Sequence, residues 1–341
     1  MMINLTAGPL GSGRPIGEGQ RPPAWESSML KAISAAGGAV CAAGDDGVVC
    51  LYLPSAPPLP GAGPLRHHLA ARPRIFGAHV YSPSLAYLVG ERGDVWRWQG
   101  RAWEALRPCT AGDLVAVAVA APGDILVGTA DGCLWRMDGQ GRALSFAELR
   151  PQARERRPVR AVAALLTRGP GEIWAAAGDV VFRMAGQRQA ERWDLPPGAG
   201  VVALAGAGDG AVIAAGEGGA WRLYPSGGAA QISREPHSGV ACDPEGNVFA
   251  TAGQELRQLH RGAWHTLFKA RGPLGGLAHD GAALWFIGPG GVFRHQPPGQ
   301  ELLRQEHHQE LQPPVVSRFA DLVGRAHVTG QTKNIRVSRG V

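Results

Sequence analysis

A short unit, one aromatic residue followed by arginine, recurs at nearly regular intervals along the chain. Its copies are Trp96-Arg97, Trp135-Arg136, Phe182-Arg183, Trp221-Arg222 and Phe293-Arg294. Each copy follows a glycine that ends a run of small apolar residues. Together with the glycines of two less regular repeats, these are Gly44, Gly90, Gly128, Gly178, Gly216, Gly253 and Gly288. The six intervals are 46, 38, 50, 38, 37 and 35 residues, and such a period is typical of four-stranded blades arranged in a ring.

The third repeat shows the pattern within one period. Four short segments follow one another at 114–120, 124–128, 133–137 and 143–149, separated by the turn signals Pro-Gly, Ala-Asp-Gly and Asp-Gly-Gln-Gly. The first segment of a repeat is the most apolar and the fourth is more polar, which suits strands that run from a crowded centre outward to solvent. The sequence therefore predicts an all-β fold, one seven-bladed β-propeller of four-stranded antiparallel blades with a C-terminal extension; six or eight blades remain alternatives.

The repeats divide the chain into three parts. An N-terminal extension, which could pack on the ring, covers 1–28, the propeller covers 29–308, and a basic tail covers 309–341. We expect the blades to begin near Leu30, Ile75, Leu114, Val159, Val201, Gly239 and Leu274, and the last to end near His307. The first and sixth repeats depart from the consensus, with Cys50-Leu51 and Leu256-Arg257 in place of the aromatic-arginine unit.

Three of these units resemble a known repeat family. Asp131-Gly-Cys-Leu-Trp-Arg136, Gly218-Gly-Ala-Trp-Arg222 and Gly290-Gly-Val-Phe-Arg294 are similar to the Gly-Gly-Leu-Tyr-Arg units of bacterial two-component-regulator-type propeller repeats. The resemblance covers about residues 30 to 305 and implies the propeller fold. Because such repeats occur in sensory and scaffold proteins alike, it implies no particular activity.

The arginines of the units have two interpretations. Neighbouring residues on a strand point to opposite faces, so the aromatic residue should pack between blades while arginine enters the next layer. We expect each arginine to stack on an aromatic ring or pair with a turn acid such as Asp94, Asp131 or Asp179. The alternative is a ring of arginines that binds an anionic ligand.

The tail combines basic charge with an apolar pattern. From Leu311 to Val341 it carries five basic residues and one acid, and apolar residues recur at helical spacing after Pro313-Pro314. The segment 334–339 alternates apolar and basic residues like an edge strand. The tail could lie on the ring, dock into another protein or remain solvated. Candidate partner-binding residues, including those of a basic loop, are Arg154, Arg156, Arg157, Arg318, Phe319, Leu322, Val323, Arg325, Arg336 and Arg339.

Histidines supply the only candidate metal ligands. His67 and His68 lie on the expected outer strand of the first blade, and His307 and His308 follow the last blade, which is its neighbour in a closed ring. Exposed histidines without a metal are the simpler interpretation. We expect His237, His265, His279 and His295 to be surface or satisfied inter-blade residues. We find no clustered carboxylates, metal-ligand motif or phosphate-binding loop, so no cofactor is predicted.

Cysteine usage and hydropathy bear on location. Five scattered cysteines favour free thiols in a reducing compartment, although Cys41 and Cys50 could face each other on neighbouring strands. The sequence shows neither a signal-peptide pattern nor a long apolar span. We therefore expect a cytoplasmic bacterial protein without membrane insertion.

The leading functional hypothesis is a non-catalytic protein-protein interaction scaffold in a bacterial multi-protein complex, which docks partners on its loops and tail. A propeller enzyme or small-molecule sensor with a pocket at the mouth of the central channel is the alternative; acids or histidines at that mouth would favour it. A third hypothesis is a nucleic-acid-associated subunit that uses the basic loop and tail.

Overall fold

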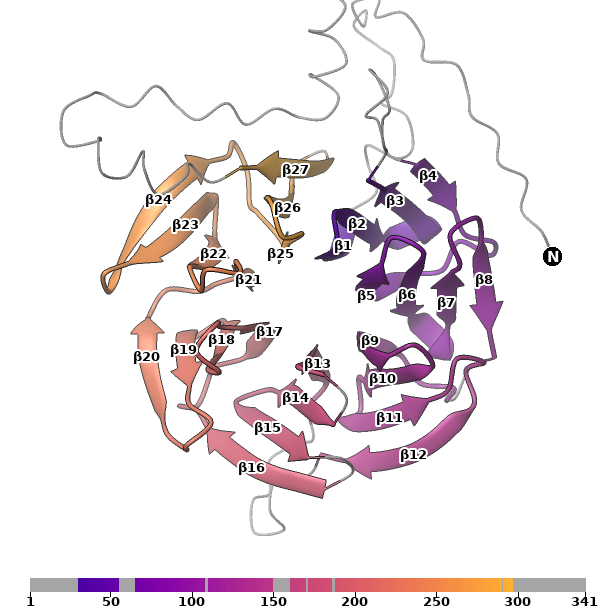
Figure 1. Cartoon of the computed structure of the whole chain (residues 1–341), viewed down its shortest axis with the longest axis horizontal. Coiled ribbons are helices and arrows are strands. Elements are labelled where there is room, and N and C mark those ends of the chain that lie inside the picture. Colours follow the sequence, from indigo (N-terminus) through magenta and orange to yellow (C-terminus); the bar gives the residue numbers. More distant parts are fainter. Residues whose placement is uncertain are drawn as a thin grey trace, which may run out of the picture.

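The chain forms a closed ring of seven antiparallel sheets in the computed structural model, with the strands of each sheet stacked from the ring's centre outward (Figure 1). The structure describes residues 30–54, 65–107, 110–149, 160–169, 171–185, 188–289 and 291–296. Six blades have four strands, and the seventh has three within the described residues. The predicted seven-bladed propeller is confirmed.

Each blade is a simple meander, because consecutive strands are hydrogen-bonded neighbours. The first three blades comprise β1 (Leu30–Ala36), β2 (Ala39–Gly44), β3 (Val48–Tyr52) and β4 (Leu65–His68); β5 (Ile75–Ser82), β6 (Leu85–Gly90), β7 (Val95–Trp98) and β8 (Trp103–Leu106); and β9 (Leu114–Ala121), β10 (Asp124–Thr129), β11 (Cys133–Met137) and β12 (Ala143–Glu148). Two short 3₁₀ turns, η1 (Asp45–Gly47) and η2 (Glu91–Gly93), join the second and third strands of blades 1 and 2.

The remaining blades repeat this order. They comprise β13 (Val162–Thr167), β14 (Glu172–Ala177), β15 (Val180–Ala185) and β16 (Arg188–Asp194); β17 (Val201–Gly206), β18 (Val212–Gly216), β19 (Gly219–Leu223) and β20 (Ala229–Ser233); β21 (Gly239–Cys242), β22 (Val248–Ala252), β23 (Glu255–His260) and β24 (Ala263–Lys269); and β25 (Leu277–His279), β26 (Leu284–Gly288) and β27 (Gly291–His295). Every blade begins within three residues of its predicted start.

The antiparallel meander gives the ring two faces that carry different turns. Turns between the second and third strands, and the connections from one blade to the next, lie on one face, which we call the linker face. Turns between first and second strands, and between third and fourth strands, lie on the opposite face, the hairpin face. The long insertions 55–64 and 150–159 lie outside the described residues, but the strand ends that flank them are on the hairpin and linker faces, respectively.

Backbone hydrogen bonds tie the linker face together. In blades 4, 5 and 6, an amide of the chain that leads to the next blade donates to a glycine carbonyl oxygen. That glycine lies in the turn between the second and third strands of the blade. The bonds are Val201 N to Gly178 O at 2.8 Å, His237 N to Gly216 O at 2.9 Å and Leu274 N to Gly253 O at 2.7 Å. The glycines that mark the repeats are therefore at the points where each connection crosses a turn.

The connection that enters a blade explains why some of these positions are glycine. A Cβ atom at Gly90 would lie 2.2 Å from the carbonyl oxygen of Arg74, and one at Gly216 would lie 2.2 Å from that of Gly200. Gly253 differs, because no atom lies within 4 Å of its Cβ position and its φ is +56°, in the left-handed region. Close approach thus requires glycine at the first two positions, whereas backbone conformation favours it at the third.

The aromatic residues of the repeated unit pack between blades, as predicted. Trp221 lies in a buried cluster with Trp174 and Trp193 of the preceding blade, and the rings of the latter two stack at 4.7 Å. Trp96, Phe182 and Phe293 likewise belong to clusters that join two blades. The hydrophobic core is therefore divided into layers between adjacent sheets.

The ring closes where blade 7 meets blade 1. Val40 and Ala42 of β2 pack with Trp285 and Val292 of blade 7, and the rings of Tyr52 and Trp285 are 5.1 Å apart. The amide of Gly38 also donates to the Asp280 carbonyl oxygen at 3.3 Å. Closure uses the same kind of apolar layer as the other blade junctions.

One expectation about cysteines is wrong. Cys41 pairs with Leu51 and Cys50 pairs with Ala42 in the β2–β3 register, so the two thiols point to opposite faces of the sheet. Both are free cysteines. Burial raises the pKa of both thiols, which disfavours the reactive thiolate.

Candidate functional site

Four of the five arginines of the repeated unit form ion pairs within the ring, and the fifth, Arg294, lies over the ring of Trp285, 5.7 Å from its centroid. Arg136 contacts both carboxylate oxygens of Asp124 at 2.5 and 2.7 Å, and Arg183 contacts Glu172 and Glu191, each at 3.1 Å. Arg222 pairs with Asp209, and its hydrogen bond lowers the pKa of that carboxyl. These guanidinium charges are balanced locally, which supports the structural interpretation over an anion-binding ring.

The partners differ from the acids that the sequence suggested. Asp124 and Glu172 begin the second strand of their blades, whereas we expected the turn acids Asp94, Asp131 and Asp179. The arginine lies near the end of the third strand, at the hairpin face, while those turns lie at the linker face. Asp179 instead accepts backbone hydrogen bonds from Gly198 and Gly200 at 3.2 and 2.9 Å.

Blade 6 breaks the pattern by one residue. In blade 5, Gly219 closes the turn by pairing with Gly216, and Arg222 follows three residues later. In blade 6, Glu255 closes the turn by pairing with Ala252, and Arg257 follows only two residues later. Because side chains alternate along a strand, this slip places Arg257 on the opposite face of its sheet, where blade 5 has Trp221.

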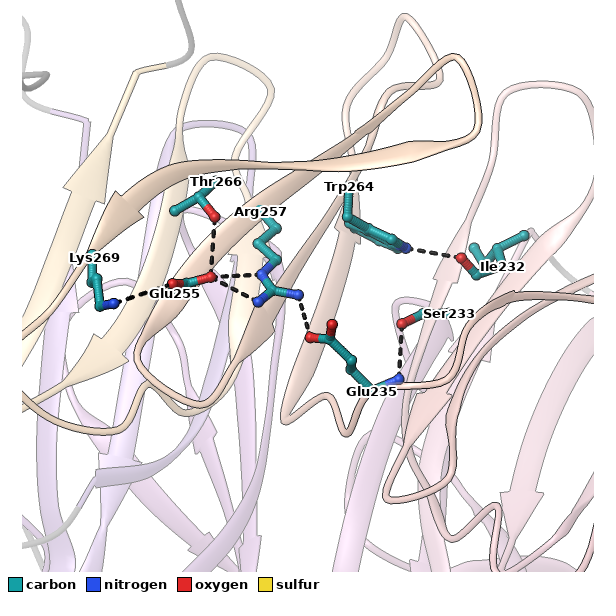
Figure 2. A network of polar contacts seen from close by, with 8 residues as sticks. All are labelled: Ile232, Ser233, Glu235, Glu255, Arg257, Trp264, Thr266 and Lys269. Carbon is teal, nitrogen blue, oxygen red and sulfur yellow. Dashed lines mark hydrogen bonds and ion pairs between the residues drawn. The ribbon is translucent and has the colours of Figure 1, made fainter. Parts of the chain in front are cut away.

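The displaced arginine is the centre of a polar network on the linker face (Figure 2). Its Nε donates to the Glu255 carboxylate at 2.8 Å, and its Nη1 bonds Glu235 in the connection between blades 5 and 6. Thr266 donates to Glu255 at 3.0 Å, and the Lys269 ammonium lies 3.5 Å from it. The hydrogen bonds from Arg257 and Thr266 lower the pKa of Glu255. The network fastens the connection to the outer half of blade 6.

A buried histidine lies beside this network. His237 is buried against the ring of Trp264, whose centroid is 5.3 Å away, and Trp264 donates to the Ile232 carbonyl oxygen at 2.9 Å. Neither ring nitrogen of His237 has a hydrogen-bond partner among the described residues, nor does Nε2 of buried His295. We expected surface or satisfied histidines, so this expectation is wrong for both. Burial lowers the pKa of each, which keeps the rings neutral at pH 7.

The predicted histidine pairs are only partly within the described residues. His67 packs edge-on against Trp98 of blade 2, with centroids 5.4 Å apart, so its ring points away from the seam with blade 7. His68 is exposed on β4, while His307 and His308 lie outside the described residues. Where the chain is described, no group of three histidine, cysteine or acidic residues is placed to hold a metal ion.

A repeated β-bulge places one residue of each of five inner strands near the centre of the linker face. The strand register shifts at the second residue of β1, β5, β9, β13 and β17. The residues at these shifts are Lys31, Phe76, Val115, Ala163 and Val202, which we call the central patch. In the last four of these blades the preceding residue is buried, whereas the bulged residue is partly exposed, and Val202 reaches 43% exposure. Bulges redirect side chains in this way.

Charge at the edge of the central patch is organised around Asp45. Its Oδ1 lies 2.9 Å from the Lys31 ammonium and 3.3 Å from the Arg74 guanidinium. Both cations also lie over the ring of Phe76, 5.6 Å from its centroid. Although burial opposes the charged carboxylate, the hydrogen bonds from Lys31 and Arg74 lower the pKa of Asp45. Lys31 within the patch and Arg74 at its edge are therefore both paired.

All of the predicted partner-binding residues lie outside the described residues. These are Arg154, Arg156 and Arg157 of the loop and Arg318, Phe319, Leu322, Val323, Arg325, Arg336 and Arg339 of the tail. Sequence reasoning did not find the central patch, because a bulge depends on hydrogen-bond register and leaves no hydrophobic period of its own. Apolar residues at the second position of the inner strands were the only available signal.

Two solved structures with propeller folds are similar to the chain. One is a catalytically inactive virginiamycin B lyase from Staphylococcus aureus with quinupristin, at a TM-score of 0.64 and 12% identity, covering 78% of this chain and 94% of that chain. The other is the WD40 β-propeller domain of Doa1, at a TM-score of 0.62 and 11% identity, covering 81% and 94%. At these identities the likeness shows the fold alone.

No family model matches the sequence, and no curated protein matches it. The resemblance to two-component-regulator-type repeats and the bacterial assignment therefore stay predictions, while the propeller fold that they implied is confirmed. No helix within the described part of the chain is long and apolar enough to cross a membrane.

Proposed function

We propose that the protein is a non-catalytic scaffold that binds other proteins through the two faces of its ring. The observation that carries the proposal is the chemistry of the seven inner strands. Within their described residues they contain no aspartate or glutamate, and their charged or titratable side chains other than cysteine and tyrosine are Lys31, His79 and His279. A pocket for acid-base catalysis at the centre of the ring would need convergent groups of that kind.

The exposed apolar residues favour protein partners. Val202 on the linker face, and Tyr81 and Tyr224 on the hairpin face, are 43%, 39% and 38% exposed. Large apolar and tyrosine side chains on a rigid surface are typical anchors of protein interfaces. The ion-paired arginines stabilise the blades, so turns and connections can vary without disturbing strand packing.

The similar structures are compatible with the scaffold and with its alternative. A WD40 domain is one neighbour and a lyase is the other. The enzyme or sensor hypothesis requires a ligand bound at the ring's centre, and the nucleic-acid hypothesis requires the basic loop and tail. Because these hypotheses require different ligands, a binding experiment can distinguish them.

Affinity capture from native cell extract tests the proposal. The full tagged chain should retain a defined set of proteins at low salt and at about 0.5 M salt, where exposed charges are largely screened. Each retained protein should then bind the purified chain directly after nuclease treatment. Loss of every protein after that treatment would favour the nucleic-acid hypothesis, and capture of none, with a small molecule raising the unfolding temperature, would favour the enzyme or sensor.

A further inference from the structure

We propose that the chain's own tail, 311–341, docks on the linker face, with its apolar residues against the central patch and its basic residues near acidic turns. The first support is the patch itself. Phe76, Val115, Ala163 and Val202 come from four consecutive inner strands, and each of these strands contacts the next. The tail carries a matching apolar set at helical spacing, Val315, Val316, Phe319, Leu322 and Val323.

The second support is the distribution of charge around the patch. Asp46, Asp131 and Glu217 are exposed in the turns of blades 1, 3 and 5, and none forms an ion pair with another described residue. The cations beside these turns are already paired: Lys31 and Arg74 with Asp45, Arg92 with Glu91, and Arg160 with Asp179. Acidic turns therefore surround an apolar centre, which suits an apolar segment flanked by positive charge.

The arginines on this face that form no ion pair with another described residue lie farther out. Arg72, Arg107, Arg234 and Arg271 each follow the outermost strand of a blade, so they begin the connections at the rim of the ring. The turn acids lie closer to the axis, between the second and third strands. The tail, with five basic residues and one acid after Leu311, thus has opposite charge to the turns that surround the central patch.

The third support is reach. The described chain ends at Gln296, just after β27, whose last residues are at the hairpin face. Eighteen residues, 297–314, separate this point from the apolar part of the tail. Extended chain spans about 3.3 Å per residue, so this segment can cover roughly 60 Å, enough to pass the height of a blade and reach the ring's centre.

A photocrosslink in the full chain tests the contact. With Val202 replaced by p-benzoylphenylalanine, irradiation of the dilute protein should join position 202 to a peptide from 311–341 of the same molecule. Replacement of Leu144, which is 59% exposed on the outer strand β12, is the matched control and should give no such product. Both proteins should keep the unfolding midpoint of the parent chain, which verifies that the ring is folded.

Charge reversal tests the electrostatic part in the same crosslinking protein. The double variant Asp46→Lys and Glu217→Lys should lower the yield of the tail crosslink about fivefold, as loss of two exposed ion pairs would predict. Glu245→Lys, an exposed acid in the hairpin-face turn of blade 6, is the control and should leave the yield unchanged.

Three results would overturn the proposal: no crosslink to 311–341, a crosslink only to a second copy of the chain, or equal yields in both charge variants. The contact between the tail and the linker face involves no partner protein. Its absence would therefore leave the scaffold function untouched. If the contact holds, a partner that binds the linker face must compete with the tail.

Discussion

Replacing Gly216 with alanine should destabilise the ring strongly, because the connection between blades 4 and 5 crosses this turn at close range. The new Cβ atom would lie 2.2 Å from the Gly200 carbonyl oxygen and 2.6 Å from that of Ala199. Carbon and carbonyl oxygen rarely approach closer than about 3.3 Å, so the connection must move by roughly 1 Å.

That movement acts on two hydrogen bonds. The Ala199 carbonyl oxygen accepts from Gly218 N at 3.0 Å, and the Gly200 carbonyl oxygen accepts from Glu217 N at 3.3 Å. Loss of a backbone hydrogen bond costs about 1 kcal/mol, and overpacking costs roughly 1–3 kcal/mol. We expect Gly216→Ala to lower the free energy of unfolding by about 3 kcal/mol.

Urea unfolding followed by tryptophan fluorescence measures this change, provided that refolding is reversible. Gly112→Ala is the matched control, because the nearest atom to its Cβ position is the Thr110 hydroxyl oxygen at 3.7 Å and its φ is not positive. It should change stability by less than about 0.5 kcal/mol. Equal midpoints for the two variants would refute the close-approach explanation of the repeated glycines.

Three further predictions concern charge and thiols. Arg257→Gln should lower the free energy of unfolding by about 1 kcal/mol, because it breaks the network with Glu235 and Glu255; urea titration against Arg234→Gln checks this, and equal stability would contradict it. Burial lowers the pKa of His79 to about 4, so stability should be full above pH 6.5 and fall by about 3 kcal/mol as pH drops to 4, because the unfolded chain takes up the proton first. His79→Leu should flatten this decline and exposed His68→Leu should not; parallel curves in all three proteins would oppose this assignment. Dithiothreitol should leave the unfolding midpoint unchanged, because Cys41 and Cys50 point to opposite faces, and a lower midpoint under reduction would contradict that register.

The repeat pattern predicted the fold because each blade has the same succession of apolar inner strand, glycine turn and aromatic residue. Local details depend on hydrogen-bond register, which the pattern does not contain. Leu256-Arg257 looked like a variant of Trp221-Arg222, yet Arg257 follows the closing pair of its turn by two residues instead of three, and this shift of one position places its side chain on the other face of the sheet. The bulges at Phe76 and Val202 also depend on hydrogen-bond register and could not be predicted from the repeat pattern.

The ion pairs were harder to predict for a geometric reason. Arg136 and Asp124 are twelve positions apart but lie across adjacent strands at the hairpin face, while Asp131 is nearer in sequence and lies at the other end of the strand. Direction along the strand therefore decides the partner. Sequence proximity suggested the wrong acids for this reason.

A direct binding measurement tests the central claim, that the ring binds proteins and is not an enzyme. Isothermal titration calorimetry of the purified full chain against each protein captured from extract should give saturable binding, weakened at least tenfold by Val202→Asp or by Tyr224→Asp, according to the face used. Leu144→Asp, on the outer strand β12, should bind like the parent chain. Absence of saturable binding to every captured protein, together with turnover of a small molecule by the purified chain, would contradict the account.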